Sequence, residues 1–277
     1  MLEIGKWNSL EVSKLVDFGV YLLGDVHDPE ILLPKRYAPK DCKPGDILDV
    51  FIYFDSEDRI IATTRKPKAM VGQVAYLKAV AVTKIGAFLD WGLEKDLFVP
   101  FKEQNQKMQA GYSYLVYIYV DDRTERIAAS SRLNRWLDSD PADLQMGQEV
   151  ELIISNKTEM GFNAIINNRF KGFIFENDIF QELKTGQQVN GFIKKIREDK
   201  KIDLMLQRPG YENIDQHIKI IYKYLLDNDG FLPLNDKSDP ADISSKFAMS
   251  KKNFKKAIGS LYKKKAISIS DNGIRII

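Results

Sequence analysis

The chain has little of what disulfide-linked or membrane proteins need. It holds a single cysteine, Cys42, so an intramolecular disulfide is impossible and a reducing compartment is expected. No apolar run approaches the roughly 18–20 residues of a membrane span, and the N-terminus has no basic segment leading into an apolar one. These absences favour a cytoplasmic protein without a signal peptide or membrane attachment.

Groups that commonly carry catalysis are also scarce. The two histidines, His27 and His217, lie far apart, and Cys42 has no neighbouring His or Cys for a metal site or thiol dyad. His217 falls beside the inner face of an expected helix, which favours a structural role. No glycine loop of the Walker or dinucleotide type is present, and no spacing singles out a carboxylate cluster among the 39 acids. We therefore predict no catalytic residues, no cofactor, no metal and no enzyme activity.

Net charge is low as well. The 41 basic and 39 acidic residues leave a formal charge of +2 on 277 residues. A strongly basic chain would by itself indicate nucleic acid as a partner, and this chain is not one. Any nucleic-acid surface is therefore expected to be local.

Three stretches of the chain share one glycine spacing. Gly19, Gly86 and Gly161 each follow another glycine by 14 residues and precede a further one by 25 or 26 residues. A basic residue lies 40 residues beyond each of them, at Arg59, Arg126 and Lys201. The repeats are offset by unequal intervals of 67 and 75 residues, which indicates separate domains and not a solenoid.

Within the second repeat, the pattern predicts five strands, at residues 77–82, 86–89, 97–100, 114–120 and 126–130. In the fourth strand, Val116 and Ile118 share one face, while Tyr117 and Tyr119 share the other. Five strands in roughly 65 residues match a small OB-like barrel. Linkers are expected around residues 66–67, around 140–141 and at 208–210, where proline interrupts the pattern.

The C-terminal region changes to helical patterning. From Tyr211 on, apolar residues recur at helical spacing, at Ile214, Ile218, Ile221, Tyr222 and Leu225, and Asn228-Asp229-Gly230 ends this first helix. Asp239-Pro240 is expected to open a short second helix that ends near Phe247.

A third helix is expected after the capping residue Ser250. Its inward residues would be Phe254, Ile258, Leu261 and Tyr262, and its other faces carry seven lysines with no acid between residues 250 and 265. Residues 267–269 and 274–276 are expected to form a hairpin. Three helices and a hairpin predict a winged helix-turn-helix, so the fold class is mainly β with a C-terminal α+β module.

The residues of the second repeat resemble the S1-type RNA-binding domain. The matching segments are Gly72-Gln73, Ile85-Gly86-Ala87-Phe88-Leu89, Leu97-Phe98-Val99-Pro100, Gly111 and Arg126-Ile127-Ala128-Ala129-Ser130. Three S1-like barrels (1–66, 67–135, 144–208) followed by a winged helix (211–277) resemble the conserved virulence factor B family of bacterial RNA-binding proteins. This resemblance implies RNA binding and an influence on gene expression after transcription, without a known catalytic activity.

The resemblance also implies where bases would stack. The S1-type site places aromatic residues just before the bend glycine and two residues after it. Phe18 and Tyr21 occupy both places in the first repeat, and Phe88 occupies one in the second. Met160 and Asn163 occupy them in the third, which predicts a weaker stacking surface there. The alternative for the aromatic residues is packing in the barrel core or between domains.

The S1-type site further combines an Asp and an Arg four residues apart. The corresponding pairs are Asp55 and Arg59, Asp122 and Arg126, and, without the acid, Arg197 and Lys201. These pairs contact RNA under one interpretation and are ordinary hairpin ion pairs under the other. The histidine that the S1-type pattern has after the third strand is absent from all three repeats. Its positions hold Pro34, Pro100 and Phe175.

Two further features have open interpretations. Tyr117 and Tyr119 correspond to Phe51 and Tyr53, and these pairs either extend the stacking surface or pack between barrels. In the third helix, Lys251, Lys252, Lys255 and Lys256 are candidates for phosphate contact, the alternative being a solvated face.

The leading hypothesis is a monomeric protein that binds single-stranded RNA and regulates gene expression after transcription. A second hypothesis is a DNA-binding transcriptional regulator that uses the winged helix, although Asn253 alone in the third helix is suited to reading bases. A third is a scaffold that binds proteins of an RNA-processing assembly.

Overall fold

The computed structural model describes residues 2–179, 182–206 and 211–277. The chain divides into two compact units, residues 1–137 and 138–277. Three closed five-stranded barrels precede a small helical domain, so the predicted fold class is confirmed. The expected linker at residues 208–210 lies outside the described residues, and the exact domain boundaries stay a prediction.

Barrels 1 and 2 make up the first unit. The strands of barrel 1 are β1 (Trp7–Val16), β2 (Gly19–Leu23), β3 (Glu30–Pro34), β4 (Ile47–Phe54) and β5 (Ile60–Thr63). Those of barrel 2 are β6 (Val74–Val82), β7 (Gly86–Asp90), β8 (Leu97–Pro100), β9 (Ser113–Val120) and β10 (Ile127–Ser130). All five strands predicted for the second repeat are present. In each barrel the fifth strand pairs in parallel with the third and closes the sheet.

Barrel 3 has the same topology. Its strands are β11 (Glu149–Thr158), β12 (Gly161–Ile166), β13 (Phe170–Phe175), β14 (Gln188–Ile196) and β15 (Ile202–Met205). It has its own apolar cluster, which includes Ile154, Phe170 and Ile174.

The repeated glycines have physical reasons. At Gly19, Gly86 and Gly161, a Cβ atom would collide with the backbone oxygen of Leu33, Val99 or Ile174 on the neighbouring strand. The glycines before and after them have φ between +74° and +92°, a region that L side chains rarely adopt; they are Gly5, Gly45, Gly72, Gly111, Gly147 and Gly186. The spacing therefore marks one strand-closure point and two turns in every barrel.

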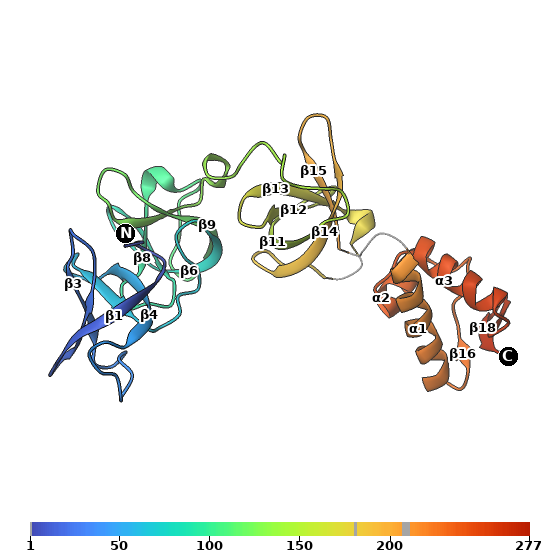
Figure 1. Cartoon of the computed structure of the whole chain (residues 1–277). Coiled ribbons are helices and arrows are strands. Elements are labelled where there is room, and N and C mark those ends of the chain that lie inside the picture. Colours follow the sequence, from blue (N-terminus) through green and yellow to red (C-terminus); the bar gives the residue numbers. More distant parts are fainter. Residues whose placement is uncertain (1, 180–181, 207–210) are drawn as a thin grey trace. The chain divides into compact units, whose positions relative to one another are not determined.

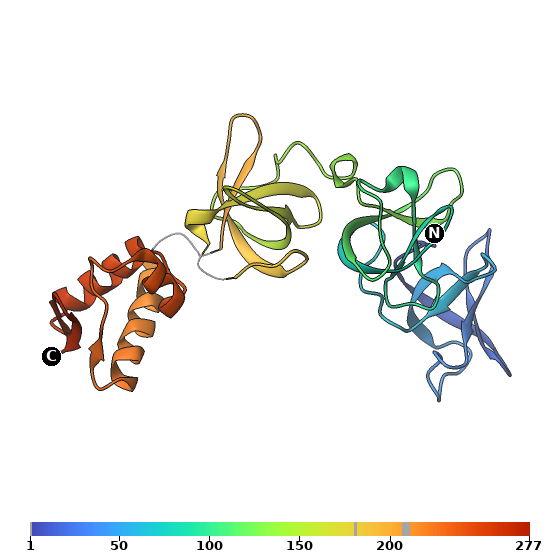
Figure 2. The ribbon, with the colours of Figure 1, turned by 180° about the vertical axis from the view of Figure 1, so that it is seen from behind.

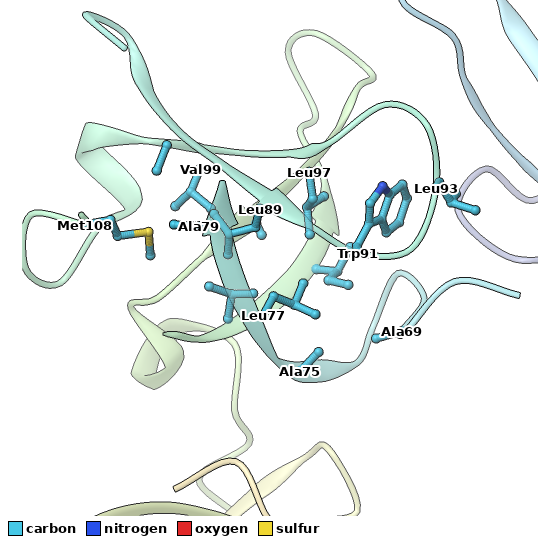
Figure 3. Packing of buried hydrophobic residues seen from close by; sticks show 14 of the residues in the cluster. Ala69, Ala75, Leu77, Ala79, Leu89, Trp91, Leu93, Leu97, Val99 and Met108 are labelled. Carbon is cyan, nitrogen blue, oxygen red and sulfur yellow. The ribbon is translucent and has the colours of Figure 1, made fainter. Parts of the chain in front are cut away.

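Barrels 1 and 2 share an apolar cluster and lie side by side in both views (Figures 1 and 2). Phe51 of β4 is fully buried and contacts Trp91 of barrel 2, with ring centroids 5.8 Å apart. Figure 3 shows Leu77, Leu89 and Leu97 of the same cluster inside barrel 2. Phe51 thus packs between barrels and does not extend a stacking surface.

The equivalent aromatic pair of barrel 2 is also used for packing. Tyr117 and Tyr119 stack on Trp136, with ring centroids 5.0 Å and 4.3 Å away. Burial raises the pKa of both Tyr53 and Tyr119 to about 12. Phe51 and Tyr53 therefore pack between barrels, whereas Tyr117 and Tyr119 pack on Trp136, which follows barrel 2.

The C-terminal domain contains α1 (Tyr211–Asp227), α2 (Pro240–Phe247) and α3 (Lys251–Lys263). Asp239 caps α2 by accepting the Ala241 amide at 2.7 Å, and Ser250 caps α3 by accepting the Asn253 amide at 3.1 Å. The predicted hairpin is confirmed as β17 (Ile267–Ser270) and β18 (Gly273–Ile276), and β16 (Phe231–Leu232) adds a third strand that the sequence did not indicate.

One prediction for α3 is wrong. Tyr262 is 57% exposed, whereas Ala257 is buried. The buried positions, Phe254, Ala257, Ile258 and Leu261, already complete one face at i, i+3, i+4 and i+7 spacing, so Tyr262 lies outside it. Of the helices in the described part of the chain, none is long and apolar enough to cross a membrane.

Candidate nucleic-acid interface

The aromatic residues predicted for barrel 1 lie on its outside. Phe18, in the turn before β2, is 59% exposed, and Tyr21 on β2 is half-buried. Their rings meet edge to face with centroids 6.4 Å apart, and Lys14 Nζ lies 4.8 Å from the Tyr21 ring. Since neither residue belongs to the barrel core, both rings remain accessible to a stacking partner.

Asp55 and Arg59 form the ion pair that their spacing suggested. Arg59 Nε and Nη2 donate to Asp55 Oδ2 at 2.9 and 2.8 Å, and Asp55 Oδ1 accepts the Glu57 and Arg59 amides. Burial acts to raise the pKa of Asp55, but the hydrogen bonds from Arg59 and Glu57 outweigh it and lower the pKa. Asp55 thus shapes the turn and holds Arg59, whose side chain is 68% exposed.

Barrel 2 presents a phenylalanine pair on its outer face. Phe88 on β7 is paired in register with Phe98 on β8, and their ring centroids are 5.2 Å apart. Ile85, just before the bend glycine, is 64% exposed beside them. Phe98 was not among the predicted site residues, although the alternation along residues 97–100 places it outward.

The predicted pairing of Asp122 with Arg126 is wrong. The Arg126 guanidinium instead pairs with Asp58 of barrel 1 at 2.7 Å. The turn before β10 is one residue longer than the turn before β5, so Asp121 takes the place of Asp55. Asp121 Oδ1 accepts the amides of Arg123 and Thr124 at 3.2 and 3.0 Å.

Asp58 joins the two barrels electrostatically. It lies at the tip of a turn in barrel 1, with φ of 61°. Besides Arg126, it binds Lys95 Nζ of barrel 2 at 2.6 Å, and Lys95 also donates to the Asp55 carbonyl at 2.7 Å. The hydrogen bond from Lys95 is the main reason that the pKa of Asp58 is lowered.

These side chains surround a groove of about 420 Å³ at the junction of barrels 1 and 2. Barrel 1 contributes Tyr53, Phe54 and Asp58, whereas barrel 2 contributes its phenylalanine pair. The basic lining residues are Lys95, Lys102, Arg123 and Arg126. The groove therefore combines an aromatic floor with cationic side chains.

Barrel 3 has an aromatic pair that was not predicted from the sequence. Phe173 and Phe175 lie on β13 with ring centroids 4.8 Å apart, and the Arg197 guanidinium lies 5.6 Å from the Phe175 ring. Asn163 is paired in register with Phe173. The weaker surface expected from Met160 and Asn163 is thus supplemented by side chains of the next strand.

The prediction that barrel 3 lacks an acid for its basic pair is also wrong. Arg197 forms an ion pair with Asp203 of β15 at 2.8 Å, so the acid comes from the following strand. Lys201 pairs with Asp199 at 2.8 Å. Both basic residues are therefore partly neutralised within barrel 3.

The four candidate lysines of α3 differ in their contacts. Lys251 Nζ donates to the Lys237 carbonyl at 3.2 Å, and Lys255 approaches Asp236 at 3.7 Å. Lys252 and Lys256 are exposed. Buried His217 lies in α1, and burial lowers its pKa, which agrees with the expected structural role.

Three OB-type barrels with outward aromatic and basic side chains, joined to a winged helix, define a multidomain protein of the nucleic-acid-binding class. The S1 domain family model matches residues 4–65 and 71–130, and the CvfB-like winged helix domain model matches residues 219–276. The chain thus combines S1 domains with a CvfB-like winged helix domain, which agrees with its resemblance to the conserved virulence factor B family.

Similar proteins cover nearly the whole chain. YitL of Bacillus subtilis (strain 168) is 28% identical over 266 residues, which are 94% of this chain and 89% of that protein. Conserved virulence factor B of Staphylococcus epidermidis (strain RP62A) is 26% identical over 282 residues, covering 99% and 94%. A crystal structure of a multidomain protein with nucleic acid binding domains from Streptococcus pneumoniae is 25% identical, with a TM-score of 0.44 and coverage of 99% and 98%.

Proposed function

We propose that the chain binds single-stranded RNA on the outer faces of its barrels and regulates gene expression after transcription, without catalysis. One recurring arrangement carries this proposal. In each barrel an outward aromatic pair lies close to an arginine of the turn between the fourth and fifth strands. These arginines are Arg59, Arg126 and Arg197.

This arrangement suits unpaired nucleotides. A base in a single strand exposes its face to an aromatic side chain, and the arginine can meet the adjoining phosphate. In a duplex the base faces are covered by their neighbours, so the aromatic pairs would find no partner. The preference for a single strand follows from the aromatic residues, and the salt dependence follows from the basic ones.

Linking the barrels strengthens binding. Each barrel contributes a modest affinity, and a strand that reaches several barrels gains from effective concentration. A monomer is sufficient for this mode of binding. The exposed α3 lysines Lys252 and Lys256 add phosphate contacts in this proposal.

The test is a salt-titrated fluorescence anisotropy assay with the full chain. It compares single-stranded RNA, single-stranded DNA and duplex DNA of about 30 nucleotides, since an OB fold covers about 4–16 nucleotides. We expect the RNA to bind more tightly than the duplex near physiological salt. Equal binding of RNA and duplex DNA would overturn the proposal.

The winged helix is the basis of the alternative, duplex DNA binding. A variant with Lys251, Lys252, Lys255 and Lys256 changed to Gln separates the two. Under our proposal its RNA affinity falls modestly, and the slope of log K against log salt becomes shallower by about 0.7 for each phosphate that is no longer neutralised by a lysine. If this variant lost nearly all nucleic-acid binding, the alternative of a DNA-binding regulator that uses the winged helix would be favoured instead.

A further inference from the structure

The groove between barrels 1 and 2 contains an acidic side chain whose place is defined by β8. Asp96 immediately precedes this strand, and Asp96 and Phe98 are two residues apart. Because alternate residues of an extended strand share a face, the two side chains point the same way, about 7 Å apart along the strand. Both line the groove. An aromatic platform therefore has a carboxylate at one end.

Asp96 differs from the acids around it. Asp58 and Asp90 form ion pairs with Lys95 and Lys68, whereas Asp96 has no hydrogen-bond or ion-pair partner among residues 2–179, 182–206 and 211–277. Burial, and secondarily the negative charge of Asp90, raises the pKa of Asp96. A half-buried carboxylate without donors is unfavourable, so a ligand that supplies two donors gains from meeting it.

The rest of the groove has the composition of a nucleotide site. The Phe88 and Phe98 rings, tilted by 39° to each other, offer an apolar surface for a flat base. Lys102, Arg123 and Arg126 line the same groove and are exposed. A base on the phenylalanine pair would leave its phosphate in reach of these cations, and its edge in reach of Asp96.

We propose that this groove binds an unpaired guanine base of the RNA and that Asp96 recognises its Watson–Crick edge. The inference rests on the proposed function. Guanine presents N1–H and the N2 amino group side by side, which matches the two acceptor oxygens of a carboxylate. Adenine, cytosine and uracil each place a donor beside an acceptor on this edge, so one carboxylate oxygen would face a lone pair.

The test uses the full chain and single-stranded RNAs of uridine that contain one guanosine, one adenosine or one inosine. The wild type should bind the guanosine RNA roughly tenfold more tightly than the adenosine RNA, as for a bidentate base contact. Inosine lacks the N2 amino group and should lose most of this preference. The inosine comparison needs no variant and so does not depend on how a variant folds.

The variant Asp96→Asn tests the residue itself. Its carboxamide pairs an acceptor with a donor, which fits the adenine edge, so the preference should move from guanosine to adenosine. Glu125→Gln is the matched control, because Glu125 is an exposed acid of the neighbouring turn that does not line the groove. The control should keep the guanosine preference.

The outcomes separate the inference from the function on which it rests. Tight RNA binding by the wild type with equal affinity for the guanosine and adenosine RNAs would overturn the guanine site and leave the proposed function intact. An Asp96→Asn variant that keeps the guanosine preference would also overturn the role of Asp96. Absence of binding to every RNA would overturn the function and the guanine site together.

Discussion

Barrels 2 and 3 have the same strand order and an outward phenylalanine pair, but they hold their arginines differently. Arg126 of barrel 2 pairs with Asp58, which belongs to barrel 1. Arg197 of barrel 3 pairs with Asp203 of its own sheet and lies over Phe175. One fold can therefore hold this arginine with an acid of a neighbouring barrel or with an acid of its own sheet.

The same contrast is found in the cores. Phe51 of barrel 1 is buried against Trp91 in a cluster that belongs mainly to barrel 2. Barrel 3 has its own cluster, in which Phe170 is buried. Barrels 1 and 2 are therefore expected to act as one cooperative unit, and residues of both line one groove.

The largest expected effect tests this cooperativity. Phe51→Ala removes a fully buried ring from the junction and should lower the free energy of unfolding by about 3–5 kcal/mol. Hydrogen exchange should then accelerate in the strands of both barrels 1 and 2. Phe170→Ala is the matched control, which should accelerate exchange in barrel 3. Acceleration confined to barrel 1 in Phe51→Ala would contradict the shared core.

The next prediction compares the two aromatic faces directly. The double variants Phe88→Ala with Phe98→Ala, and Phe173→Ala with Phe175→Ala, should each weaken RNA binding by about 1–3 kcal/mol per stacked base. These residues are only half-buried, so circular dichroism should show folded protein in both cases. An unchanged affinity for one double variant would remove that barrel from the interface.

Alkaline pH should distinguish the first unit from barrel 3. The pKa of Tyr53 and Tyr119 is about 12 in the folded chain and about 10 when unfolded, so the unfolded state loses protons first as pH rises. The contribution of these two tyrosines to the free energy of unfolding is therefore fully present below about pH 10. It declines above that pH, by about 1 kcal/mol per tyrosine near pH 11. Barrel 3 contains no tyrosine between residues 144 and 206.

Tryptophan fluorescence measures this effect selectively, because Trp7, Trp91 and Trp136 all lie in the first unit. Urea unfolding followed by fluorescence should show the alkaline loss of stability in the wild type and about half of it in Tyr53→Phe. An equal loss in that variant would show that Tyr53 is not the group responsible.

The smallest expected effect concerns Asp58. Asp58→Asn frees Lys95 and Arg126 from an internal acid, so RNA affinity should rise by up to about fivefold, in keeping with exposed ion pairs worth less than about 1 kcal/mol. Asp41→Asn, at an exposed acid of barrel 1, controls for the simple removal of a negative charge. Equal gains in affinity for the two variants would mean that Asp58 does not compete with RNA for the cations.

The fold was largely predictable from sequence because local backbone demands recur. The glycines at fixed spacing mark turns with positive φ and a strand contact that leaves no room for Cβ. The capping residues Asp239 and Ser250 likewise fixed the helix starts. These features depend on near neighbours in the sequence, which is why the pattern revealed them.

The candidate site was less predictable because parts of it are not local. The residue four positions before Arg126 is Asp122. The ion-pair partner of Arg126 is instead Asp58, 68 positions earlier and in another barrel. Asp203 replaces the missing acid of barrel 3 from the next strand. Phe98 and Phe173 were visible through strand alternation, yet they fall outside the two positions that the S1-type pattern emphasises.

Photo-crosslinking tests the central claim most directly. Single-stranded RNA containing 4-thiouridine would be irradiated with the full chain, and the crosslinked peptides identified by mass spectrometry. We expect crosslinks in peptides that carry Phe18 and Tyr21, Phe88 and Phe98, and Phe173 and Phe175. Crosslinks confined to residues 211–277 would contradict the claim, because the barrels would then not be the RNA-binding surface.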